Sequence, residues 1–276
     1  MINMSGENQM RIARFQDTEG QVHYGIDRGN PELEVLEGDL YAGLRPTGRI
    51  AVQAQRLAPL VPANIFCIGL NYRAHAAETG AKLPESPVVF MKPSSALADP
   101  DSEIRLPACC TRGPEVDYEA ELAVVIGKAA RNVEPGRALE HVLGYCCAND
   151  VSARRWQKHG GGGQWVRGKS FDTFCPLGPV LVTPEEIPDP QALRVRAWLN
   201  GEAMQDGNTA DMIFGVADLI SFLSQDTTLL PGTLILTGTP AGVGFARTPP
   251  VFLAPGDEIV VEIEGIGRLS NQVAQG

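Results

Sequence analysis

Short apolar runs separated by glycine and proline are the feature that most limits the fold of this chain. Its 276 residues include 30 glycines and 21 prolines, a composition that favours turns and strands over a helix bundle. The runs with the length and character of strands are 65–70, 87–92, 119–127, 179–183, 193–202, 233–238 and 258–267,. We therefore expect a mainly β protein.

Helical spacing of apolar residues is confined to a few segments. They are 71–80, 136–145, 152–159 and 215–225,. A doubly wound sheet or a TIM barrel needs a helix after nearly every strand, and here too few helices separate the strands. The pattern predicts an α+β class in which a mixed, mainly antiparallel β roll carries peripheral helices.

The beginning of the chain indicates a separate small β unit. Residues 10–26 alternate in two short runs around a glycine turn, which is a hairpin pattern,. Two prolines within 57–64 interrupt the periodicity just before an apolar strand,. The sequence predicts a small N-terminal β-rich domain over 1–61, frayed over 1–9, and a larger domain over 62–276.

Charge and cysteine usage limit partners and location. With 23 Lys and Arg against 33 Asp and Glu, the net charge is −10, whereas nucleic acids and anionic membranes favour basic surfaces. No apolar run reaches the roughly 18 residues of a membrane span, and the first residues do not resemble a secretory signal. Two vicinal cysteine pairs are poor material for a disulfide framework,. We expect a cytoplasmic protein that binds neither nucleic acid nor membrane.

Carboxylates on one face of an apolar strand are the strongest chemical signal. In VDYEAEL, residues 116–122, side chains alternate between faces, so Asp117, Glu119 and Glu121 share one face,. The two glutamate Cα atoms would lie about 7 Å apart, which lets both carboxylates reach one cation. Asp150 ends another apolar stretch and could add a third. Oxygen donors without histidine or cysteine favour Mg²⁺ or Mn²⁺ over Zn²⁺, and a solvated strand face is the alternative.

His75 and Glu78 are a second candidate pair. They lie three residues apart in the predicted helix over 71–80, hence on one side of it,. A carboxylate beside an imidazole orients the ring and raises its basicity, which suits a general base that activates water. A surface pair without a catalytic role has the same spacing, so spacing alone leaves both interpretations open.

Two glycine-rich segments need separate interpretations. GQWVRGKS, residues 163–170, matches the P-loop pattern, but a P-loop requires a buried strand before it and a helix after it, and neither is predicted here,. We therefore reject a nucleotide site and keep Lys169 as a cation that could bind a carboxylate or stabilise an enolate. In TGTPAGVG, residues 237–244, the backbone amides and Thr239 could line a pocket or form a tight turn.

Taken in order, these motifs resemble the fumarylacetoacetate hydrolase family. The matching stretches cover roughly 62–273 and are GLNYRAHAAE, PVVFMKPSSA, VDYEAELAVVIGK, GYCCANDVSARRWQ, GKSFDTFCPLGP, NGE, LTGTPAGVG and GDEIVVEIEGIG. The resemblance implies the mixed β-sandwich roll of the family's C-terminal catalytic domain, preceded by a small variable domain, in a homodimer. Within the family the chain resembles the acylpyruvase and oxaloacetate tautomerase-like branch. TFCPLGP and PPVFL look more like the subgroup with known oxaloacetate keto–enol tautomerisation, and other parts are similar to sugar-acid diketo hydrolases.

The resemblance also implies roles for individual residues. The implied ligands of Mg²⁺ or Mn²⁺ are Glu119, Glu121 and Asp150. The implied catalytic residues are His75, Glu78 and Lys169. The implied substrate contacts are Arg154, Gln157 and Thr239. Leu70 departs from the pattern, since some acylpyruvate-hydrolysing members have arginine there, and the departure leaves recognition of a substrate carboxylate open.

The leading hypothesis is metal-dependent hydrolysis of a carbon–carbon bond in a 2,4-dioxo acid, such as an acylpyruvate, fumarylpyruvate or diketo sugar acid. The metal would chelate the substrate, His75 with Glu78 would activate water, and a pyruvate enolate would leave, stabilised by the metal and Lys169. The alternative is keto–enol tautomerisation or decarboxylation of oxaloacetate, which uses the same metal enolate without water. A ligand-binding member of the fold without catalysis is a third hypothesis.

Overall fold

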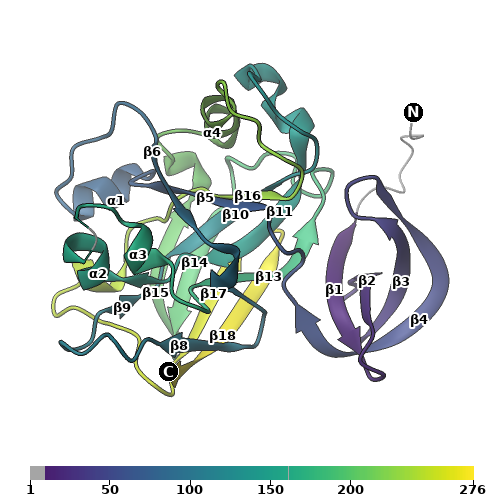
Figure 1. The fold of residues 1–276 in the computed structure, drawn as a ribbon, viewed down its shortest axis with the longest axis horizontal. Coiled ribbons are helices and arrows are strands. Elements are labelled where there is room, and N and C mark those ends of the chain that lie inside the picture. Colours follow the sequence, from purple (N-terminus) through teal and green to yellow (C-terminus); the bar gives the residue numbers. More distant parts are fainter. Residues whose placement is uncertain (1–9, 161) are drawn as a thin grey trace.

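The computed structural model describes residues 10–160 and 162–276, so the fraying expected over 1–9 lies outside the described residues. The N-terminal unit consists of β1 (Arg11–Asp17), β2 (Val22–Ile26), β3 (Glu32–Asp39) and β4 (Gly43–Leu57). β1 pairs antiparallel with both β2 and β4, and β3 pairs with β2 and β4, so the four strands close on themselves (Figure 1). The hairpin predicted over 10–26 is confirmed.

A large sheet continues from the N-terminal unit into the rest of the chain. Its further strands are β5 (Asn64–Gly69), β6 (Val88–Lys92), β7 (Leu97–Ala98), β10 (Ala120–Ile126), β11 (Val142–Asn149), β13 (Cys175–Val182) and β16 (Thr233–Leu236). The order along the sheet is β2-β3-β4-β1-β13-β11-β10-β16-β5-β6, with β7 paired to β13. β1 joins β13 through only two residue pairs. The division at residue 61 stays a prediction, because this ladder crosses it.

A second sheet packs against the first. It has the order β15-β14-β17-β18-β8 and consists of β8 (Glu103–Leu106), β14 (Arg194–Leu199), β15 (Glu202–Asn208), β17 (Glu258–Ile263) and β18 (Gly267–Gln275). β10, β11 and β13 face β14, β17 and β18. Every residue of β10 is buried, as expected for an apolar strand covered on both faces,. The predicted mainly β fold is confirmed.

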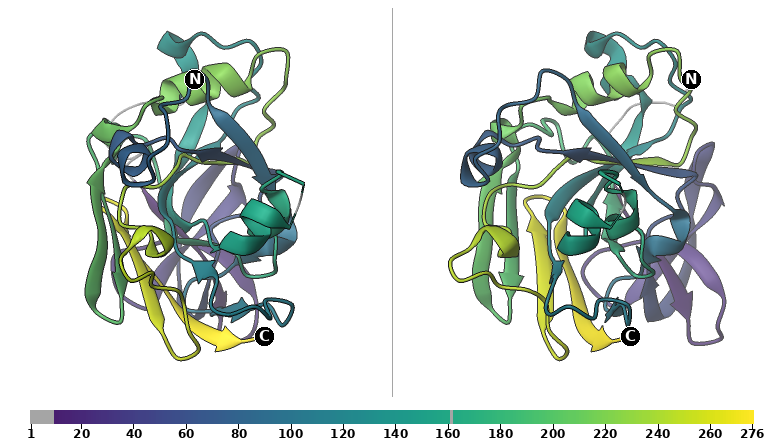
Figure 2. Two further views of the ribbon diagram at one scale, coloured as in Figure 1. Left: turned by 90° about the vertical axis from the view of Figure 1, so that its left-hand side faces the viewer. Right: turned by 60° about the vertical axis from the view of Figure 1, so that its left-hand side comes forward.

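Helices are short and peripheral. They are α1 (Arg73–Glu78), α2 (Arg154–His159), α3 (Val166–Lys169) and α4 (Val216–Leu223), with 3₁₀ turns η1 (Ser94–Ala96), η2 (Pro135–His141), η3 (Thr209–Asp211) and η4 (Gly244–Ala246). Figure 2 shows α4 at one end of the molecule and α2 with α3 on its side. No helix in the described part of the chain has the length and apolar character needed to cross a bilayer.

The helix predicted over 136–145 is wrong in its second half. Only η2 has helical backbone, and from Val142 the chain forms β11. β11 lies between β10 and β13, where a run of apolar residues is buried on both faces, and such a run has no periodicity that separates strand from helix,. Tertiary pairing therefore decides its conformation.

Candidate active site

The VDYEAEL segment lies where the chain passes from a separate two-stranded sheet into the large sheet. A short strand β9 (Val116–Asp117) pairs with β12 (Ser152–Ala153), and β10 begins only at Ala120. The side-chain oxygen of Asn149 accepts a hydrogen bond from the Glu119 amide at 3.0 Å, and the Asp150 amide donates to the Glu119 carbonyl at 2.9 Å. The break between β9 and β10 is thereby fixed against the end of β11.

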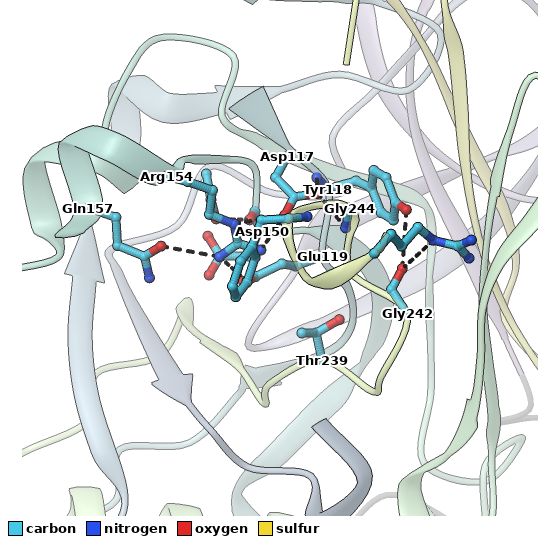
Figure 3. Close-up of polar contacts among 12 residues, drawn as sticks. Asp117, Tyr118, Glu119, Asp150, Arg154, Gln157, Thr239, Gly242 and Gly244 are labelled. Atoms are coloured by element: carbon cyan, nitrogen blue, oxygen red, sulfur yellow. Dashed lines mark hydrogen bonds and ion pairs between the residues drawn. The ribbon is translucent and has the colours of Figure 1, made fainter. Parts of the chain in front are cut away.

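Three carboxylates meet at this break. Glu119, Glu121 and Asp150 each bring one oxygen within 4.8 Å of the others, and all three are buried. Asp117, which alternation places on the same face, does not join them. Its carboxylate accepts a hydrogen bond from Arg154 at 2.8 Å and two from backbone amides at the start of η4 (Figure 3). The structure thus brings together the three predicted metal ligands and sets Asp117 apart.

Cations surround two of the three carboxylates. The Lys169 Nζ lies 2.6 Å from both Glu119 Oε2 and Asp150 Oδ2, and Arg154 Nη1 lies 2.7 Å from Glu119 Oε1. Burial opposes ionisation of Glu119, but the charges of Lys169 and Arg154 outweigh it and lower the pKa of Glu119. Burial likewise opposes the charge of Lys169, yet Asp150 and Glu119 raise its pKa. Lys169 is therefore a cation at neutral pH and not a base.

Lys92 also contacts the carboxylate cluster, and the sequence analysis did not predict it. Its Nζ lies 2.6 Å from Asp150 Oδ1 and donates to the carbonyls of Val151, Lys169 and Phe174 at 3.1, 2.6 and 2.7 Å. A lysine at the end of the otherwise apolar strand β6 is the only signal in the sequence. Its partners come from three distant segments, so only the fold reveals them.

Glu121 differs from its neighbours in having no cationic partner among the described residues. Its carboxylate accepts a hydrogen bond from the Gly238 amide at 2.7 Å. Burial, followed by the charges of Asp150 and Glu119, raises the pKa of Glu121 well above its usual range. A buried carboxylate without a cation is costly, and three converging oxygens are the donor set of a hard divalent ion. The residues present therefore fit a divalent cation.

His75 and Glu78 form the pair that spacing predicted. On α1, His75 Nδ1 lies 3.1 Å from Glu78 Oε2, and the other Glu78 oxygen accepts a hydrogen bond from the Gly242 amide at 2.9 Å. His75 is buried and faces the same cavity as Glu119 and Glu121. With Nδ1 held by the carboxylate, the second ring nitrogen is left for a substrate or a water molecule.

The three predicted substrate contacts also line this cavity, but Arg154 and Thr239 are already engaged. Arg154 is bound to Asp117 and Glu119, and its Nη1 also donates to the Gln157 side-chain oxygen at 3.1 Å (Figure 3). The Thr239 hydroxyl donates to the Ala120 carbonyl at 2.9 Å and accepts from Gln205. Both side chains therefore hold the segment that carries Glu119 and Glu121 in place, and their contact with substrate stays a prediction.

The cavity has a charged floor and an aromatic roof. Its volume is about 250 Å³. The roof is formed by Trp165 and Phe90, whose ring centres lie 5.6 Å apart in an edge-to-face contact. Trp165 fits because Gly69 has no side chain, since a Cβ there would lie 2.2 Å from the indole ring. The GQWVRGKS segment thus supplies Trp165 and Lys169 to the cavity. α3 has only four residues, and among the described residues the element before it is the helix α2, so this segment does not have the strand–loop–helix order of a P-loop.

Fold and site together define a mainly β enzyme built around buried carboxylates. The sequence matches the family described as fumarylacetoacetate (FAA) hydrolase C-terminal over residues 64–274, and the one described as Rv2993c-like, N-terminal, over residues 10–59. The first match covers most of the chain. The chain belongs to the fumarylacetoacetate hydrolase family.

Individual relatives are similar along most of the chain. The human protein named oxaloacetate tautomerase FAHD2A, mitochondrial, is 45% identical over 249 residues, which are 90% of this chain and 78% of that protein. A solved structure named 5-carboxymethyl-2-hydroxymuconate delta-isomerase, from Mycobacterium smegmatis, has a TM-score of 0.84 and 38% identity over 97% of this chain and 100% of its own. A 2-hydroxyhepta-2,4-diene-1,7-dioate isomerase from Mycobacterium marinum has a TM-score of 0.82 and 37% identity over 96% and 98%.

Proposed function

We propose that this enzyme catalyses keto–enol tautomerisation of oxaloacetate. The observation that carries the proposal is the buried cluster of Glu119, Glu121 and Asp150, in contact with Lys169 and facing a cavity that His75 also lines. The names of the relatives support this alternative over hydrolysis, because they specify an oxaloacetate tautomerase and two isomerases. The name of the Mycobacterium marinum protein also specifies a dioate, a molecule with two carboxylates.

The three carboxylates are the residues that would hold Mg²⁺ or Mn²⁺. A bound divalent cation supplies positive charge that orients a 2-oxo acid and polarises its carbonyl group. Lys169 adds a fixed cation beside the same carboxylates, which favours the negative charge that develops on the 2-oxo oxygen when a proton leaves the neighbouring carbon. The raised pKa of Lys169 suits this electrostatic function.

We assign the proton transfer to His75. Tautomerisation takes one proton from C3 of oxaloacetate and adds one to the oxygen on C2, without a change of oxidation state. His75 can accept the first proton on the ring nitrogen that does not face Glu78, and the imidazolium can return it to oxygen,. Glu78, itself held by the Gly242 amide, keeps the ring in that orientation.

The hydrolysis hypothesis has one observation in its favour. The same His75 and Glu78 pair could activate a water molecule for attack on the distal carbonyl of a 2,4-dioxo acid,. Decarboxylation of oxaloacetate needs no such base. The three reactions therefore differ in what they require of His75 and in their products.

An assay with two substrates separates these reactions. Purified protein with Mg²⁺ or Mn²⁺ is mixed with oxaloacetate or, separately, with acetylpyruvate. Enol absorbance and pyruvate release are followed together, and the same metal concentration without protein gives the background. We expect faster enol equilibration without pyruvate release, and loss of the effect in chelator. Pyruvate from oxaloacetate would indicate decarboxylation, and pyruvate from acetylpyruvate would indicate hydrolysis. Enol equilibration no faster than the metal background would refute the proposal.

Three further expectations stay predictions, namely Mg²⁺ or Mn²⁺ as the bound ion, the homodimer and the cytoplasmic location. A small 2-oxo or 2,4-dioxo acid as partner agrees with the family. The cytoplasmic location is likewise untested, and the human relative is named as mitochondrial. Mass measurement in solution and metal analysis of the purified protein would test the first two.

A further inference from the structure

A cation on the wall of the cavity has no partner in the carboxylate network. Lys158 follows Arg154 by four residues on α2, so the two side chains lie on one side of this helix, and both line the cavity,. Arg154 and Lys169 each pair with two carboxylates. Among the cavity-lining residues that the structure describes, Lys158 is the cationic side chain without a carboxylate partner.

This cation lies over the ring of Phe245. The Lys158 Nζ lies 4.1 Å from the centre of the Phe245 ring, and the Arg154 guanidinium carbon lies 4.3 Å from the same centre. The Lys158 Nζ and the Arg154 guanidinium carbon are therefore no further apart than the sum of these two distances, because both lie against the same ring,. Burial, followed by the charge of Arg154, lowers the pKa of Lys158. Lys158 is exposed, and an anion beside it would offset the repulsion from Arg154.

The remaining wall offers little else to an anion. Leu70 and Ile68 are apolar and line the cavity together with the aromatic roof. Gln157 turns its side-chain oxygen toward Arg154, which leaves its amide nitrogen as a neutral donor. A negative group that extends from the carboxylate cluster toward α2 would meet Lys158 as its charged partner.

We propose that Lys158 binds the second carboxylate of the substrate and makes the enzyme selective for 2-oxo dicarboxylates over 2-oxo acids with a neutral tail. This inference rests on the proposed function. A four-carbon diacid spans about 4 Å between its carboxyl carbons, because three bonds of about 1.5 Å at tetrahedral angles separate them. One end of the substrate would lie at the carboxylate cluster and the other would reach toward α2.

The kinetic test compares oxaloacetate with its 4-methyl ester, which keeps the 2-oxo acid and neutralises the second carboxylate. For Lys158→Met we expect KM for oxaloacetate to rise about 10-fold with kcat nearly unchanged, and KM for the ester to change less than about twofold. Lys158→Arg should restore most of the selectivity. Lys128→Met is the matched control, because Lys128 is exposed and does not line the cavity. Equal changes for both substrates, or none, would overturn the inference.

A binding test keeps the inference separate from the proposed reaction. Metal-loaded protein is titrated calorimetrically with oxalate, which has no tail, and with N-oxalylglycine, a stable 2-oxo acid analogue with a second carboxylate. Lys158→Met should weaken N-oxalylglycine about 10-fold and leave oxalate unchanged. If the wild type fails to tautomerise oxaloacetate but shows this difference, the proposed function fails and the inference stands. If both ligands respond alike, the inference fails whatever the activity.

Discussion

Replacing Glu121 by glutamine should stabilise the metal-free protein and abolish its stabilisation by metal. Glu121 is buried, its pKa is raised well above 4.5 by burial and by Asp150 and Glu119, and the described residues offer it no cation. Glutamine keeps an oxygen that can accept the hydrogen bond from the Gly238 amide and removes the charge. The glutamate at 121 thus lowers the stability of the metal-free protein as the cost of binding a metal, and the substitution removes that cost.

The magnitude follows from the proton that the folded protein retains. As the pH rises past 4.5, the unfolded chain loses the Glu121 proton first, so stability falls until the pH reaches the raised folded pKa,. At pH 7 this penalty is at most about 3.4 kcal/mol, which is 2.5 pH units at about 1.36 kcal/mol each. Two like charges 4.8 Å apart repel by a similar amount, about 3.5 kcal/mol at an effective dielectric constant of about 20,.

Urea denaturation in chelator between pH 5 and pH 8 measures this penalty. The gain of Glu121→Gln over wild type should grow from below about 1 kcal/mol at pH 5 to about 3 kcal/mol at pH 7. Adding Mn²⁺ should then stabilise wild type and leave the variant unchanged. Glu202→Gln, at an exposed strand end, controls for net charge. A metal-free variant less stable than wild type at pH 7, or a difference independent of pH, would refute the reasoning.

Three more substitutions test the rest of the site. Lys92→Met should destabilise the protein by about 3–5 kcal/mol in urea denaturation, because it leaves Asp150 with one cation and three carbonyls without a donor,. Unchanged stability would contradict this. His75→Asn should lower kcat about 10² to 10⁴-fold, with metal affinity in calorimetry nearly unaltered; full turnover would exclude it as the proton carrier. Gly69→Ala should displace Trp165, which indole fluorescence would detect, and should raise KM several-fold in the activity assay. An unchanged fluorescence spectrum would contradict the predicted clash.

The sequence could predict the carboxylate cluster because its signal is local. Alternation within VDYEAEL points Glu119 and Glu121 to one side, and Asp150 follows a buried run,. Alternation also included Asp117, which the structure pairs with Arg154 instead. The strand is interrupted at Tyr118 and Glu119, between β9 and β10, and strand periodicity contains no information about such a break.

Contacts between distant segments lay beyond prediction from the residues alone. Lys92 binds carbonyls from three other parts of the chain, and Lys158 is distinctive only because the neighbouring Arg154 is already paired. Helical periodicity over 136–145 was equally compatible with a buried strand. In each case the outcome depends on which segments meet, and hence on the whole fold.

The fit of the Trp165 indole over Gly69 has a consequence for how this enzyme can diversify. The aromatic roof comes from β6 and the segment before α3, whereas the three carboxylates of the floor come from β10, the residue before it and the residue after β11. A larger residue at 69 requires a smaller one at 165, because a Cβ at 69 already overlaps the ring. The two positions should therefore covary among homologues, and exchanging them as a pair could reshape the space for a substrate tail while the ionic network stays intact.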